Sequence, residues 1–226
     1  MWRGLDIAGT VIEHVVREEA RLACEGAVHG LDSLRELQLH GPVAGAFEAI
    51  GLGVQREVAY PSLTPAQRKR PDCLRCDIVV TERPDLRVSD ALEARRRADS
   101  PTLFEESRRE HTSQPEDCLW LEVKTVGQFT FTNGIPGPNR AYSSELIGSV
   151  MRDAVKLGKD ARIEHGAVLV VVFSESREVA EHDIAIAVRR SLDRSAPIGG
   201  VSFSHTPIAD RIGNAIATAA ILEIAR

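Results

Sequence analysis

The chain has no apolar run long enough to cross a membrane. The longest such run, residues 167–173, is far shorter than a bilayer-spanning helix. The first residues reach Asp6 and Glu13 without the unbroken apolar stretch of a signal peptide. These absences predict a cytoplasmic protein with no membrane partner.

Cysteine is too scarce for a disulfide framework or a clear zinc site. Of the 4 cysteines, Cys73 and Cys76 form one Cys-x-x-Cys pair, and no second pair accompanies them. A structural zinc site needs four ligands, usually arranged as two pairs. The 7 histidines show no ligand spacing either. We therefore expect reduced, unliganded thiols, with a zinc or redox site as the remote alternative.

Several motifs that would point to other chemistry are also missing. The sequence contains neither a Gly-x-x-x-x-Gly-Lys phosphate loop nor a Gly-x-Ser-x-Gly elbow, which argues against ATP use and serine hydrolysis. The net charge of −5 argues against a strongly basic nucleic-acid coat. Basic clusters at 68–70, 95–97 and 108–109 could still make one cleft locally positive, or could simply be solvated surface charge.

Apolar periodicity predicts alternating helices and strands. A helical pattern covers about 5–28, and a Ser33-x-x-Glu36 capping box predicts a second helix, interrupted at Gly41-Pro42 and resumed up to Gly51. Later helices are expected at 143–157 and near 177–192. Strands are expected at 54–60, 76–80, 119–124, 167–173 and 201–207, while 215–224 fits either element.

Two segments lack a sustained period. Residues 82–117 are polar and charged and are interpreted as an insertion with a helix near 91–98. Residues 127–139 are rich in Gly, Pro and Asn and are expected to form a loop. Together the patterns predict one α/β domain over 1–226, with a mixed β-sheet core flanked by helices on both faces.

The strand at 119–124 carries the most informative residues. Because strand side chains alternate, Glu122 and Lys124 share a face near the strand's end, and Asp77 lies near the start of the preceding strand. Asp77, Glu122 and the Val123 carbonyl are a suitable ligand set for Mg²⁺. Lys124 could then orient or deprotonate a water and stabilise charge on phosphorus. The alternative is a surface Glu-Lys pair, but only 4 lysines occur in the chain, and this one ends an otherwise apolar strand.

The residues Arg75-Cys-Asp77-Ile-Val-Val80 and Leu121-Glu122-Val-Lys124 give the chain a family resemblance. Over about 33–173 the order of elements resembles the PD-(D/E)xK superfamily of restriction-endonuclease-like nucleases. The resemblance implies a restriction-endonuclease-like fold and an Mg²⁺-dependent nuclease, with Mn²⁺ as a substitute, acting mainly on DNA and in some relatives on RNA. The chain departs from the family pattern in the long segment between the two motifs and in lacking a proline next to Asp77.

The resemblance also implies further site residues. Glu36 is placed to be a metal ligand from the first core helix, or alternatively to cap Ser33, and Glu48 and Glu57 are the next candidates. Lys156, Gln128 and Arg140 are placed to contact substrate phosphates, although each is equally suited to a plain surface or loop position. These residues complete the predicted site.

Two functions follow from these residues. The first is a DNA endonuclease of restriction or host-defence type, working alone, as a homodimer or with a protein partner that supplies specificity. The second is a catalytically silent nuclease-fold subunit that binds nucleic acid or a protein partner.

Overall fold

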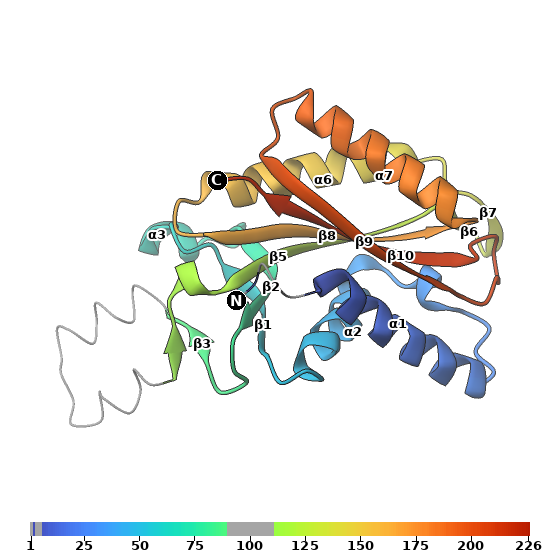
Figure 1. Ribbon diagram of the computed structural model, residues 1–226, viewed down its shortest axis with the longest axis horizontal. Helices are drawn as coiled ribbons and strands as arrows, with labels where there is room; N and C mark the ends of the chain where they lie inside the picture. Colours follow the sequence, from blue (N-terminus) through green and yellow to red (C-terminus); the bar gives the residue numbers. More distant parts are fainter. Residues whose placement is uncertain (1, 3–5, 90–110) are drawn as a thin grey trace.

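A six-stranded mixed sheet with helices on both faces forms the centre of the protein (Figure 1). The computed structural model describes residues 2, 6–89 and 111–226. The strands lie in the order β1 (Gly53–Ala59), β2 (Arg75–Thr81), β5 (Leu119–Gly127), β8 (His165–Ser174), β10 (Ile216–Ile224) and β9 (Ile198–Pro207). Strands β5 and β8 pair in parallel, and the other neighbours pair antiparallel. The predicted α/β class with a mixed sheet is confirmed.

The sheet separates two apolar cores. Helices α1 (Ile7–Cys24) and α2 (Glu36–Glu48) cover one face, and α6 (Tyr142–Lys159) and α7 (Arg177–Leu192) cover the other. Strand β8 contributes to both, with Leu169 and Val171 in the first core and Val168 and Val170 in the second. A strand buried on both faces needs an uninterrupted apolar sequence, which explains the run that periodicity identified.

The start of α2 differs from the prediction. Ser33 belongs to a short 3-10 helix, η2 (Leu31–Ser33), and α2 begins only at Glu36, with the backbone N–H of Arg35 donating to the Gln38 side chain. The capping role predicted for Glu36 is therefore wrong. Pro42 also lies inside α2 instead of interrupting it. Apolar residues on both sides of Pro42 pack in the same core, and this packing outweighs the local cost of proline.

The segment expected to be a loop at 127–139 contains a hairpin. Strands β6 (Phe129–Thr132) and β7 (Ile135–Pro138) pair antiparallel across Asn133 and Gly134, which both have positive φ. An Asn-Gly pair is the usual sequence of such a two-residue turn, so the signal was present. The ambiguous segment 215–224 is a strand, because its burial between β8 and β9 requires one.

The remaining elements lie around the sheet. Helix α3 (Pro65–Arg68) follows β1. The predicted insertion contains β3 (Arg87–Val88), which pairs in parallel with β4 (Thr112–Ser113), and the 3-10 helix η3 (Pro115–Asp117). The helix predicted near 91–98 lies outside the described residues. Within the described part of the chain, no helix combines the length and the apolar character that crossing a membrane requires.

Candidate functional site

The candidate site lies where β2 and β5 separate. The two strands pair from Val80 opposite Leu119 to Ile78 opposite Leu121, and within the described residues their pairing ends there. Instead, the Asp77 carboxylate accepts the backbone N–H of Val123 at 2.7 Å. The carboxylate thus replaces the next rung of the ladder and is held between the two strands.

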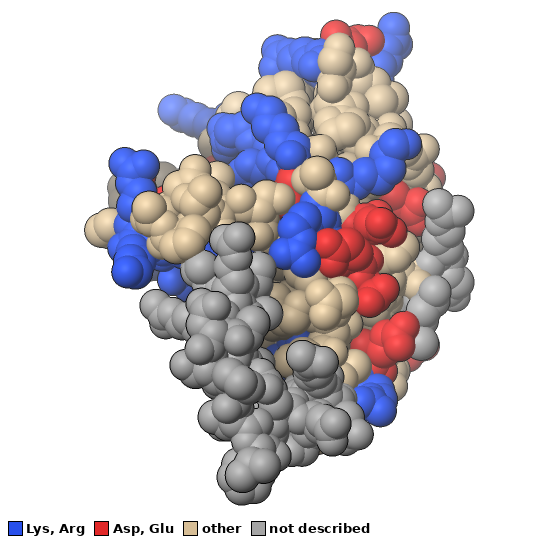
Figure 2. Space-filling model, turned by 90° about the vertical axis from the view of Figure 1, so that its left-hand side faces the viewer, with Lys and Arg blue, Asp and Glu red and all other residues tan. Residues whose placement is uncertain are grey.

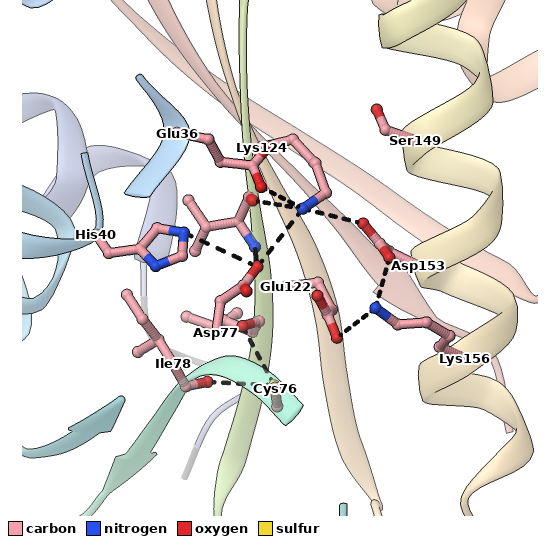
Figure 3. A network of polar contacts seen from close by, with 12 residues as sticks. Glu36, His40, Cys76, Asp77, Ile78, Glu122, Lys124, Ser149, Asp153 and Lys156 are labelled. Atoms are coloured by element: carbon pink, nitrogen blue, oxygen red, sulfur yellow. Dashed lines mark hydrogen bonds and ion pairs between the residues drawn. The ribbon is translucent and has the colours of Figure 1, made fainter. Parts of the chain in front are cut away.

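Lys124 points into a ring of oxygens at this opening (Figure 3). Its Nζ atom lies 2.9 Å from Glu36 Oε1, 3.0 Å from the Val123 carbonyl oxygen, 3.3 Å from Asp153 Oδ2 and 3.6 Å from Asp77 Oδ2. Burial opposes the charge, but Asp153 and the hydrogen bond to Glu36 outweigh it and raise the pKa of Lys124. The side chain is therefore an ammonium at neutral pH, suited to stabilising negative charge and not to removing a proton.

A histidine that the sequence did not reveal joins two of the predicted carboxylates. One possible ligand atom from each of Glu36, His40 and Asp77 lies within 4.8 Å of the others. Glu36 and His40 are one helical turn apart on α2, and Asp77 faces them from β2. The only sequence signal for His40 is its i, i+4 spacing from Glu36, which is too common to identify a ligand.

His40 is fully buried, and neither ring nitrogen has a hydrogen-bond partner within the described residues. Its Nε2 atom lies 4.0 Å from Asp77 Oδ2, and its Nδ1 atom lies 4.0 Å from Glu57 Oε1. Burial lowers the pKa of His40 despite the nearby carboxylates of Asp77 and Glu36. A neutral imidazole with an unused lone pair beside two carboxylates is the form in which histidine binds a metal ion.

Glu122 makes its contacts on the α6 side of the sheet. The Tyr60 hydroxyl donates to Glu122 Oε1 at 2.5 Å, and Lys156 Nζ lies 3.1 Å from the same oxygen. Burial, followed by the charges of Asp77 and Asp153, raises the pKa of Glu122 to about 7. Glu122 is not a member of the Glu36, His40 and Asp77 group.

Asp153 connects the two lysines of the site. It is 5% exposed, and its two oxygens lie 2.9 Å from Lys156 Nζ and 3.3 Å from Lys124 Nζ. Asp153 and Lys156 are three residues apart on the face of α6 that packs on the sheet. A continuous series of ionic contacts therefore leads from Glu122 through Lys156, Asp153 and Lys124 to Glu36.

A cleft of about 710 Å³ opens beside Lys124. Exposed Arg35 and Arg152 lie on its wall, together with Glu36, Lys124 and Asp153. Its lining contains more carboxylates than cationic side chains, so a bound cation would make it more favourable for an anionic ligand.

Charge is also unevenly distributed over the surface of the protein. On the face shown in Figure 2, Lys and Arg gather mainly in the upper part and Asp and Glu on the right.

The other predicted contact residues, Gln128 and Arg140, are next to residues that line this cleft but are not in its lining as far as the described residues define it. Gln128 accepts the backbone N–H of Glu175 through its side-chain oxygen at 3.0 Å, which ties the start of the hairpin to the end of β8. Arg140 is exposed in the turn before α6.

The assembled groups have two chemical capacities. Glu36, His40 and Asp77 offer oxygen and nitrogen ligands to a divalent cation, and Lys124 supplies a fixed positive charge next to them.

Comparison with protein-family models, with curated proteins and with solved structures found no match.

Proposed function

We propose that this chain is a metal-dependent nuclease that hydrolyses phosphodiester bonds, with DNA as its substrate. The observation that supports this most is the meeting of Glu36, Asp77 and Lys124, from three separate elements, at the open end of the β2–β5 pair. A cleft that could accept a polymer backbone is lined by two of these residues, Glu36 and Lys124. The proposal also agrees with the resemblance of the two strand motifs to restriction-endonuclease-like nucleases.

Glu36, His40 and Asp77 are the residues that would hold the metal ion. They fit this role because the buried His40 nitrogens have no partner among the described residues and the two carboxylates supply negative charge. Two carboxylates alone would suit Mg²⁺, whereas an imidazole favours Mn²⁺ over Mg²⁺. When bound, the ion polarises a phosphate and lowers the pKa of a water.

The chain's own residues would bind and orient the phosphate. The Lys124 ammonium stabilises the negative charge that develops on phosphorus, and Asp153 holds that ammonium in place. Arg35 and Arg152 contact neighbouring phosphates across the cleft. In the reaction, a water oxygen bonds to phosphorus while the bond to the leaving ester oxygen breaks. The water loses a proton to solvent, and the leaving oxygen takes one up.

The test is cleavage of supercoiled plasmid, linear duplex, single-stranded DNA and RNA with Mg²⁺ or Mn²⁺. We expect metal-dependent cutting of DNA by the wild type, and none by Lys124→Ala or Asp77→Asn. Lys159→Ala is the matched control, because Lys159 is exposed at the end of α6 and is not in the lining of the cleft. Equal cutting by Lys124→Ala and Lys159→Ala would overturn the assignment of the site.

One observation favours a second candidate, a nuclease-like subunit that binds without cutting. Tyr60 and Lys156 both contact Glu122 Oε1, and Glu122 lies outside the group that could hold a metal ion. This candidate predicts a folded protein that binds Mn²⁺ and nucleic acid but cleaves none of the four substrates. Cleavage by the wild type would eliminate it.

A further inference from the structure

One edge of the sheet ends in a long strand with an open side. Strand β9, ten residues long, is last in the strand order and pairs with β10, and its other edge has no strand partner within the described residues. Figure 1 shows β9 between α7 on one face and α1 on the other. Unpaired N–H and C=O groups along such an edge can pair with another chain.

An apolar groove of about 410 Å³ runs beside this edge, between β9 and α7. Val201 and Phe203 of β9 are 39% and 42% exposed, and Leu192 at the end of α7 is 49% exposed. Ile184 and Val188 form the wall of the groove on α7. Exposed large apolar side chains gathered in one groove are typical of a protein-binding surface.

The charges on the groove face of α7 are self-complementary. Glu181 and Arg189 both line the groove, and each is four residues from the exposed Ala185. If a second α7 crosses antiparallel at Ala185, Glu181 of each helix faces Arg189 of the other. The small side chain of Ala185 allows the two helices to approach closely. Neither a parallel arrangement nor an unrelated partner would make use of this symmetry.

The geometry points to a second copy of this chain as the occupant of the groove. In this dimer a two-fold axis passes near Ala185 and Ser202, and β9 pairs antiparallel with β9 of the other copy. The sheet then continues through both copies, and Phe203 is covered by the other copy's groove. The interface is isologous, so each favourable contact occurs twice. This inference does not depend on the proposed nuclease function.

The first test is the mass of the full chain in solution, measured by analytical ultracentrifugation over a range of concentrations. We expect the wild type to form dimers and Phe203→Lys to be monomeric. Ile135→Lys is the control, since Ile135 is a more exposed apolar residue on the β6–β7 hairpin. Val201→Lys serves as a second variant if circular dichroism shows that Phe203→Lys is unfolded. A monomeric wild type, or a dimer unaffected by both lysine variants, would overturn the inference.

A charge exchange separates a second copy from any other occupant. Glu181→Arg and Arg189→Glu each place like charges together twice per dimer, so each variant alone should dimerise roughly tenfold more weakly. Mixing the two variants pairs opposite charges at both contacts, so a heterodimer should form with about wild-type affinity. Because Glu181 also pairs with Arg177 and His205 within the chain, thermal unfolding of each variant controls for lost stability. Failure of the mixture to form heterodimers would show that the two helices do not meet in this way.

Discussion

Replacing Lys124 by methionine removes the ammonium that three carboxylates surround while keeping most of the apolar side chain. In the structure this ammonium neutralises Glu36, Asp77 and Asp153 at distances of 2.9 to 3.6 Å. A divalent ion held by Glu36, His40 and Asp77 would lie close to the same charge. We therefore expect Lys124→Met to bind metal more tightly, although the variant should not cut DNA.

The size of the effect follows from the distances. A divalent ion and the Lys124 ammonium about 4 Å apart would repel each other by about 8 kcal/mol, twice the value for two unit charges, at the effective dielectric constant of a protein surface. Solvent reduces this value, because the Glu36 side chain is 40% exposed and the freed Lys124 ammonium can turn toward the cleft. A gain of about 1.4 to 2.8 kcal/mol remains, which corresponds to a ten- to hundredfold lower Kd.

Isothermal titration calorimetry with Mn²⁺ on the chelator-treated protein measures this change. Lys159→Met is the control and should bind Mn²⁺ as the wild type does, since Lys159 is exposed at the end of α6. A Kd for Lys124→Met equal to or higher than that of the wild type would refute the reasoning. It would mean that the ammonium and the metal ion do not share these carboxylates.

Three further changes test other parts of the site. His40→Gln removes a buried nitrogen ligand and should weaken Mn²⁺ binding more than Mg²⁺ binding; an unchanged Mn²⁺ affinity by calorimetry would exclude His40 from the metal site. The pKa of Glu122 in the folded chain is about 7, above the ordinary value of 4.5. Between these two pH values the folded state therefore binds more protons than the unfolded state. The free energy of unfolding consequently falls as the pH rises from 4.5 to 7. Urea unfolding of metal-free Glu122→Gln should show a weaker fall between pH 4.5 and 7, and an unchanged slope would contradict the raised pKa. Arg35→Ala and Arg152→Ala should each raise the Kd for single-stranded DNA several-fold, measured by fluorescence anisotropy at low salt, without changing Mn²⁺ affinity. An unchanged Kd for DNA would show that these two residues do not contact the substrate.

Local patterns in the sequence were sufficient to predict most of the helices and strands of the fold. The apolar run in β8 and the amphipathic spacing of α6 predicted these two elements within a few residues, because burial on a sheet or helix face imposes a pattern on the chain. The start of α2 and its passage through Pro42 were predicted wrongly. There, packing of the surrounding apolar residues decided the outcome, and a single sequence does not display that packing.

The candidate site was likewise predicted in part from the sequence and decided in part by the tertiary structure. Alternation along β5 placed Glu122 and Lys124 toward one face, and the contacts that α6 makes with both side chains agree with that placement. Only the tertiary structure associates Lys124 with Asp153, Glu122 with Tyr60, and Asp77 with His40. These partners come from α6, the end of β1 and α2, and their spacing along the chain carries no period. Their proximity is decided by how helices pack on a sheet, which is a property of the whole domain and not of any local segment.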